Sequence, residues 1–142
     1  MTGILVLVGT LLVGALAGTG LSLRNGRIRR PAMASDSTPP PTPVADALVP
    51  GAVTLVQLST TFCAPCRHTR AVLSRIAEST AGVAHVEFDI ADRPQLAEDL
   101  RVMRTPTTIA FDDKGTELLR IGGVPKLDAL RAALAPHVRL TD

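Results

Sequence analysis

Cys63 and Cys66 are the only cysteines in a chain of 142 residues, and they stand three positions apart in the segment Phe62-Cys63-Ala64-Pro65-Cys66. Two thiols at this spacing can close a small disulfide ring and open it again. Such a short ring constrains the unfolded chain little, so the spacing suits redox turnover better than structural cross-linking. If the pair begins a helix, the backbone N–H groups there favour the thiolate, which is the nucleophile in disulfide exchange. The pair therefore predicts a thiol–disulfide exchanger.

The elements on either side of the cysteines fit this chemistry. Residues 53–58 form a short apolar run rich in β-branched side chains, which predicts a buried strand. Residues 68–79 carry apolar side chains on one face, as an amphipathic helix does. A strand, Cys-x-x-Cys and a helix in succession indicate a redox motif and not half of a zinc site. His68 and His85 keep zinc open as an alternative. The chain has no second cysteine pair to complete four ligands, however, so we expect no metal and no bound cofactor.

Downstream of this helix, strands and helices continue to alternate. We expect a strand at 83–89, a short helix at 94–101, a hairpin with strands at 108–111 and 117–121, and a closing amphipathic helix that contains Leu127, Leu130, Ala133 and Leu134. The predicted order is β-α-β-α-β-β-α.

Residues from about 50 to 140 resemble the thioredoxin family. Three features carry the resemblance, namely the Phe62–Cys66 segment, the later Thr105-Pro106-Thr107 element, and Gly122-Gly123 before the last helix. The resemblance implies a thioredoxin-like α/β fold for residues 51–142, shortened at its start, with a mixed four-stranded sheet flanked by helices. In the family, the proline that matches Pro106 follows a cis peptide bond and faces the cysteines across a groove. A trans proline that merely begins a strand is the alternative.

The same resemblance implies separate roles for the two cysteines. Cys63 would attack a substrate disulfide and form a mixed disulfide, and Cys66 would then attack Cys63 and release the reduced substrate. The substrate groove would be lined by Phe62, Ala64, Pro65, Thr105 and Pro106, with the Thr105 backbone able to pair with an extended peptide. The Ala-Pro interior resembles that of reducing thioredoxins. We therefore expect a reductase of protein disulfides that takes electrons from a thioredoxin-reductase-like enzyme or from a membrane electron carrier.

Three positions depart from the family pattern. Phe62 replaces the usual tryptophan and loses an indole hydrogen-bond donor. Gln57 stands where the family places a buried acid that helps to deprotonate the resolving thiol, and an amide cannot take up a proton. His85 stands where the family often has lysine. Gln57 and His85 are therefore a candidate proton relay, since the pKa of histidine lies near neutrality. A partly solvated strand histidine without such a role is the alternative.

The N-terminal segment is the second strong feature of the sequence. Residues 1–23 contain no charged side chain, and 4–23 has about the length that a helix needs to span a bilayer. Arg24, Arg27, Arg29 and Arg30 follow at once. A cleaved signal peptide would carry its positive charges before the apolar run and would have a shorter core. We therefore expect a retained transmembrane helix at 1–23 and a basic juxtamembrane segment at 24–30.

The same arginines predict the orientation of the chain. Positive flanks tend to stay in the cytoplasm, so we expect a single-pass protein of the cell membrane whose redox domain is cytoplasmic. A redox domain outside the cell, serving cytochrome maturation or repair of envelope disulfides, is the alternative. Residues 31–142 hold 11 Lys and Arg against 13 Asp and Glu, so the formal net charge of +2 comes from the juxtamembrane arginines. This charge gives no reason to expect nucleic-acid binding.

Residues 31–50 are rich in Pro, Ser, Thr and Ala, with three consecutive prolines at 39–41. This composition predicts an extended, semi-rigid linker between the membrane helix and the domain at 51–142. One further class of function stays open, a thioredoxin-fold binding module whose groove holds a partner while the cysteines rarely turn over. Gln57 and the replacement of the family's tryptophan by Phe62 favour a binding module, whereas the intact cysteine pair favours an enzyme.

Overall fold

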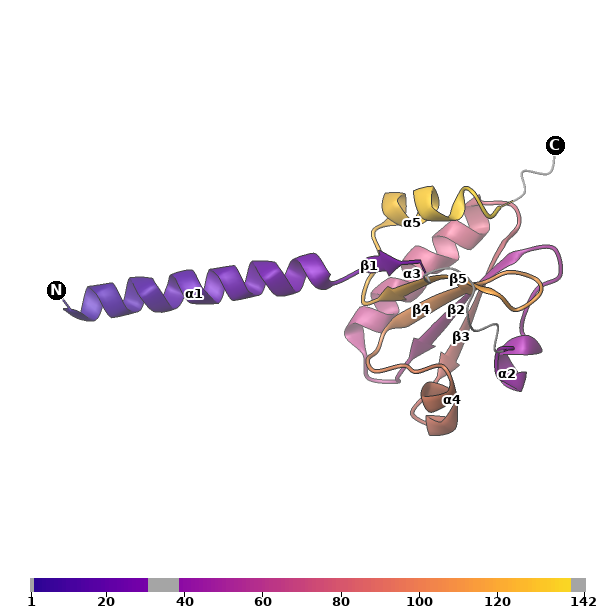
Figure 1. The fold of residues 1–142 in the computed structure, drawn as a ribbon, viewed down its shortest axis with the longest axis horizontal. Coiled ribbons are helices and arrows are strands. Elements are labelled where there is room, and N and C mark those ends of the chain that lie inside the picture. The colour runs from indigo at the N-terminus through magenta and orange to yellow at the C-terminus, as the bar shows by residue number, and fades with distance from the viewer. Residues whose placement is uncertain (1, 31–38, 139–142) are drawn as a thin grey trace.

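The structure is a computed structural model that describes residues 2–30 and 39–138 (Figure 1). Its elements, in chain order, are α1 (Thr2–Arg24), β1 (Arg27–Arg29), α2 (Thr42–Ala45), β2 (Val53–Ser59), α3 (Ala64–Ser79), β3 (Val83–Asp89), α4 (Pro94–Asp99), β4 (Thr107–Phe111), β5 (Glu117–Gly122) and α5 (Leu127–Leu134). From β2 to α5 this is the predicted β-α-β-α-β-β-α order.

The strands form one five-stranded sheet in the order β1-β5-β4-β2-β3. β2 and β3 run parallel, joined by the crossover helix α3, and the other neighbouring strands are antiparallel. The mixed α/β sheet that the resemblance implied is therefore confirmed. All seven residues of β2 are buried, because β2 lies inside the sheet and helices cover both of its faces (Figure 1).

The core is divided between the two faces of the sheet. Helices α3 and α5 pack on one face and α4 lies on the other (Figure 1). The apolar residues of α3 recur at helical spacing, so Leu73 and Ile76 both point into the first core, where Leu130 of α5 joins them. On the α4 face, Leu96 packs with Ile109 of β4. The two cores hold β2 and α3 in place, with Cys63 between these elements and Cys66 in the first turn of α3.

β1 adds a fifth strand to the four that the sequence predicts, and it comes from the segment expected to be only a basic juxtamembrane stretch. Ile28 lies opposite Ile121 of β5 and packs against the first core, whereas Arg27 and Arg29 are exposed. Successive side chains of a strand point to opposite faces, so a single apolar residue between two arginines can face the core. The structure thus differs from the predicted sheet by one edge strand.

Part of the predicted linker also packs on the domain. Residues 31–38 lie outside the described part of the chain. Further on, α2 buries Val44 completely in the second core with Leu48 beside it, and the Pro40 ring packs close to Gly115. The linker expected for residues 31–50 is therefore not extended at α2, where the burial of Val44 favours a helical turn.

Helix α1 extends away from the domain as one continuous helix (Figure 1). Its segment Thr2–Leu23 is long and apolar enough to cross a membrane, and its large apolar side chains are exposed. Gly26, with a φ of 72°, turns the chain from α1 into β1, and its N–H donates a hydrogen bond to the carbonyl oxygen of Gly122 over 2.9 Å. The apolar helix is therefore followed almost at once by a strand of the domain.

Candidate active site

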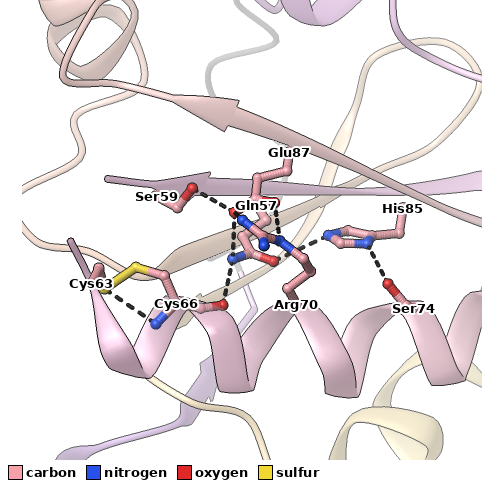
Figure 2. A network of polar contacts seen from close by, with 8 residues as sticks. All are labelled: Gln57, Ser59, Cys63, Cys66, Arg70, Ser74, His85 and Glu87. Carbon is pink, nitrogen blue, oxygen red and sulfur yellow. Dashed lines mark hydrogen bonds and ion pairs between the residues drawn. A yellow bond between two sulfur atoms is a disulfide. The ribbon is translucent and has the colours of Figure 1, made fainter. Parts of the chain in front are cut away.

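Cys63 and Cys66 lie where β2 gives way to α3, and they form a disulfide with Cα atoms 5.1 Å apart (Figure 2). Cys63 is the N-cap of α3, and its Sγ accepts a hydrogen bond from the N–H of Cys66 over 3.1 Å. The Cys66 residue is only 1 % exposed, whereas Cys63 is partly exposed. A substrate can therefore reach Cys63 first. This difference fits the expected roles of Cys63 as the attacking thiol and Cys66 as the resolving thiol.

The neighbours of the cysteines are exposed. Phe62 is 98 % exposed, so its ring is free to contact a substrate and contributes nothing to the core. Ala64 and Pro65 lie in the exposed first turn of α3. Pro65 is tolerated there because the first N–H groups of a helix have no intrahelical partner. All three residues are therefore accessible at the surface, next to the cysteines in the chain.

The segment before β4 holds the other two residues of the predicted groove. The peptide bond between Thr105 and Pro106 is cis, as the resemblance implied. Thr105 is partly buried and Pro106 is buried. The carbonyl oxygen of Pro106 accepts a hydrogen bond from the N–H of Gly123 over 2.8 Å, which ties this segment to the turn after β5.

Gln57, fully buried on β2, lies at the centre of a polar network beside the disulfide (Figure 2). Its amide nitrogen donates to the backbone carbonyl oxygen of Cys66 over 3.0 Å and to a carboxylate oxygen of Glu87 over 3.2 Å. Both partners can only accept, so the amide nitrogen must face them and the amide oxygen must face His85. The hydrogen-bond partners therefore fix which way the Gln57 amide points.

His85 is held in one neutral form by its two partners. Its Nε2 donates to the amide oxygen of Gln57 over 3.1 Å, because that oxygen can only accept. Its Nδ1, 3.3 Å from the Ser74 hydroxyl, then accepts a hydrogen bond from that group. Burial lowers the pKa of His85; the Glu87 carboxylate counteracts part of this effect and Arg70 adds to it. The ring is therefore uncharged near neutral pH.

Glu87 is one of four members of this network that the sequence does not single out; the others are Ser59, Arg70 and Ser74. The register of β2 and β3 places Glu87 directly opposite Gln57. Its carboxylate accepts hydrogen bonds from the Ser59 hydroxyl over 2.6 Å and from the Arg70 guanidinium over 2.9 Å. Burial opposes ionisation, but the bonds from Arg70 and Ser59 outweigh it and lower the pKa of Glu87. Strand alternation puts Glu87 on the same face as His85, but only the strand register could have revealed its contact with Gln57.

This arrangement fixes the backbone carbonyl of Cys66. Gln57 lies between Cys66 on one side and the Glu87 carboxylate and His85 ring on the other (Figure 2). An amide can hold these groups in place but does not take up a proton at neutral pH. In residues 2–30 and 39–138, no three His, Cys, Asp or Glu side chains come close enough together to hold a metal ion.

Comparison with known proteins agrees with this geometry. The family model for thioredoxin matches residues 46–136. The chain belongs to the thioredoxin family. The thioredoxin of Staphylococcus aureus is 31 % identical to it over 94 residues, which cover 66 % of this chain and 89 % of the relative. A thioredoxin-family chain with a cysteine pair at disulfide distance is a thiol–disulfide oxidoreductase.

Solved thioredoxin structures share the fold. A mutant thioredoxin from Halobacterium salinarum aligns with a TM-score of 0.62 at 23 % identity, covering 75 % of this chain and 100 % of that chain. The oxidized form of mitochondrial thioredoxin 3 from Saccharomyces cerevisiae aligns with a TM-score of 0.57 at 20 % identity, covering 67 % and 88 % of the two chains. At these identities the likeness establishes the fold alone.

Proposed function

We propose that this thioredoxin-family protein is a membrane-tethered reductase of protein disulfides. The main support for disulfide exchange is the disulfide at the start of α3, which joins the partly exposed Cys63 to the buried Cys66. The Ala-Pro pair between the cysteines, which resembles that of reducing thioredoxins, supports reduction as the direction. Neither observation names a particular substrate, so the substrates are protein disulfides as a class.

The proposed cycle transfers two electrons. The Cys63 thiolate attacks one sulfur of a substrate disulfide, which forms a mixed disulfide and releases the other substrate sulfur as a thiolate. The Cys66 thiolate then attacks the Sγ of Cys63, which closes the Cys63–Cys66 disulfide and releases the second substrate thiolate. Both released thiolates take up protons from solvent. An upstream thioredoxin-reductase-like enzyme or a membrane electron carrier returns two electrons and reopens the disulfide.

In this proposal Gln57 and His85 hold Cys66 in place and do not relay protons. The hydrogen bond from Gln57 holds the carbonyl of Cys66, and His85 holds the Gln57 amide. A proton passing from Cys66 to His85 would have to cross the amide of Gln57, which is not a proton carrier near neutral pH. Solvent therefore serves as the proton source and acceptor for Cys66.

The surface around the disulfide is the proposed substrate site. In this proposal the exposed ring of Phe62 and the cis-bonded Thr105-Pro106 segment before β4 both contact the substrate. Pro106 has no N–H, so the backbone of Thr105 is left to pair with an extended peptide. This geometry favours a disulfide in an extended or locally unfolded segment.

The membrane tether rests on α1. Thr2–Leu23 has the length and apolarity of a membrane span, and Arg24, Arg27, Arg29 and Arg30 follow it. Positive flanks favour the cytoplasmic side, so the proposed redox domain is cytoplasmic. We place the span at residues 1–23 and extend the proposed domain beyond 51–142 to include β1 and the segment from α2 onward.

Two experiments test these proposals separately. In the full chain, Cys66→Ser should accumulate a mixed disulfide with a disulfide-bonded peptide, and Cys63→Ser should not. The reverse pattern would contradict the assigned roles. On intact cells, a membrane-impermeant alkylating reagent should leave the reduced cysteines unlabelled until the cells are permeabilised. Labelling before permeabilisation would place the domain outside, where cytochrome maturation or envelope disulfide repair becomes the function.

A binding module is the second candidate, and Gln57 in place of the family's acid is the observation that favours it. A partner that bound the Cys63→Ser/Cys66→Ser double variant as tightly as the unaltered chain, together with no turnover of model disulfides by the unaltered chain, would establish that role. Loss of binding in the double variant would support the reductase.

A further inference from the structure

A pocket of about 530 Å³ lies beside β1 and β5, near the segment that leads into β4. Five arginines from separate parts of the chain line it, namely Arg27, Arg29, Arg101, Arg104 and Arg120. Among the described residues, no Asp or Glu lines this arginine pocket. Met103, which is 93 % exposed, adds an apolar side chain to its wall. The pocket therefore combines a strong positive charge with one exposed apolar group.

The charges of the arginine pocket are mostly unbalanced within the described chain. Arg120 pairs with Glu117 over 2.7 Å, and Arg104 donates to the carbonyl oxygen of Gly122 over 3.1 Å. No ion pair within residues 2–30 and 39–138 involves the other three arginines. The register of β1 and β5 even places Arg29 directly opposite Arg120. Like charges in that arrangement destabilise a sheet, so a bound anion would stabilise it.

The end of α4 sets the position of Arg101. Its φ of 52° lies in the left-handed region, just after α4 ends. Glycine is the usual residue at such a helix end because it adopts this conformation without a steric penalty. The N–H of Arg101 donates to the carbonyl oxygen of Glu98, so this conformation closes the end of α4. It also places Arg101 in the lining of the arginine pocket.

The location of the arginine pocket indicates which anion it binds. Arg27 follows Leu23, the end of the apolar span, by four residues, and four extended residues reach at most about 14 Å. The polar headgroup layer of a bilayer is about 5 to 8 Å deep on each side, so β1 begins at or just above it. The guanidinium group of arginine forms two parallel hydrogen bonds with two oxygens of one phosphate, so a cluster of arginines at this height suits the phosphates of lipid headgroups.

We propose that the arginine pocket binds the phosphate of an anionic phospholipid headgroup and so holds the redox domain against the membrane surface. This proposal rests on the proposed membrane span. Free phosphate has the same chemistry, but the pocket is tethered beside lipid headgroups, so we assign the lipid as the ligand. Docking of this kind would fix the height and direction of the Cys63–Cys66 site above the bilayer.

A single-tryptophan reporter tests this binding, because the chain contains no tryptophan. The full chain with Met103→Trp is reconstituted in phosphatidylcholine vesicles, with or without phosphatidylglycerol, and each vesicle carries a trace of a dansyl-labelled headgroup lipid. Energy transfer from the introduced tryptophan to dansyl should be higher with phosphatidylglycerol. Adding Arg27→Gln, Arg29→Gln and Arg101→Gln should lower the ratio of docked to free domain by roughly a hundredfold, about fivefold for each arginine.

A matched control removes three positive charges elsewhere. Arg75, Lys114 and Lys126 are exposed and lie outside the arginine pocket. Their replacement by glutamine should leave the energy transfer unchanged. Equal transfer in both lipid mixtures, or an equal loss in the control variant, would overturn the lipid site. Inorganic phosphate is also added to the chain in phosphatidylcholine vesicles. If it changed the tryptophan emission as much as phosphatidylglycerol does, the lipid site would be overturned.

Failure of the tether is distinguishable from failure of the lipid site. A chain that alkaline carbonate extracts from the vesicles is not anchored, and that result would overturn both the proposed tether and this proposal. A chain that resists extraction but shows equal energy transfer in both lipid mixtures would overturn the lipid site alone.

Discussion

The side-chain amide of Gln57 donates a hydrogen bond to the backbone carbonyl oxygen of Cys66 over 3.0 Å. This bond joins β2, an interior strand of the sheet, to the first turn of α3, which begins just after Cys63 and contains Cys66. Gln57 is fully buried, so its bonds do not compete with water. At the position where the family places an acid, this chain therefore has an amide that holds the backbone of Cys66, the resolving cysteine of the proposed cycle.

Replacing Gln57 by leucine should destabilise the oxidised protein. Gln57→Leu keeps the approximate size of the side chain but leaves the Cys66 carbonyl and the His85 N–H without their partner. A buried group that loses its partner costs about 1–3 kcal/mol. The free energy of urea unfolding of the full chain in detergent measures this loss. Gln95→Leu on α4, where the amide is exposed, is the control and should change stability by no more than about 0.5 kcal/mol. Equal losses in both variants would contradict the role given to Gln57.

Restoring an acid at this position should accelerate the resolving step. Gln57→Glu would place a second carboxylate beside Glu87, which lies 3.2 Å from the Gln57 amide nitrogen. Two adjacent carboxylates cannot both ionise freely, so the pKa of one rises and it becomes a proton acceptor nearer neutral pH. Stopped-flow reduction of a disulfide-bonded peptide at neutral pH should therefore be faster than in the unaltered chain. A slower or unchanged rate would show that Cys66 does not depend on an acceptor at this position.

His85 should make the stability of the fold depend on pH. Its pKa in the folded chain is lowered from 6.5, so below about pH 6.5 the unfolded chain binds a proton that the folded chain does not. The free energy of unfolding should therefore fall as the pH drops through about 6.5 and should keep falling until the lowered folded pKa is passed. Glu87 acts at lower pH, because its pKa is lowered from 4.5 and its contribution is lost only below that value.

Urea unfolding between about pH 7.5 and about pH 5.5 measures this effect. His85→Asn should flatten the slope in that window. The disulfide exchange rate of the His85→Asn variant should vary between pH 6 and pH 8 as it does in the unaltered chain, because Gln57 blocks proton transfer to His85. A changed pH dependence of the exchange rate in this variant would contradict this expectation and support a proton relay through Gln57 and His85.

The turn at Gly26 should control whether β1 stays on the sheet. An added Cβ at Gly26 would lie 2.2 Å from the backbone carbonyl oxygen of Val124, and the φ of 72° also disfavours other residues. Gly26→Ala should therefore release β1, and the amides of residues 27–29 should exchange faster with deuterium. Gly51→Ala is the matched control, since Gly51 has a φ of 73° but open space at the Cβ position. Unchanged protection of β1 in Gly26→Ala would contradict this packing.

Local patterns in the sequence predict the part of the fold that surrounds the cysteines. The β-branched run of β2 and the apolar face of α3 are each visible within a short window, so their order and the position of the pair at the helix start follow directly. The cis bond before Pro106 followed from the resemblance and not from periodicity. These features place Cys63 and Cys66 correctly without any knowledge of long-range contacts.

The features that the sequence does not predict depend on distant partners. The tripeptide Arg27-Ile28-Arg29 has one apolar residue, and only pairing with β5 makes it a strand. Val44 lies in a proline-rich stretch, and its burial depends on the second core. Glu87 meets Gln57 because of strand register, which alternation within a single strand cannot specify. In each case, a contact between segments far apart in the chain decides the local structure.

Redox titration of the full chain in detergent tests the reductase assignment most directly. The chain is equilibrated in thiol–disulfide buffers of known potential, and the fraction of free Cys63 and Cys66 thiols is measured by alkylation, with Cys63→Ser as the control. We expect one two-electron transition near or below about −250 mV, close to that of reducing thioredoxins, and none in the control. A transition near about −120 mV, where strongly oxidising relatives lie, or no transition in the unaltered chain, would contradict the assignment.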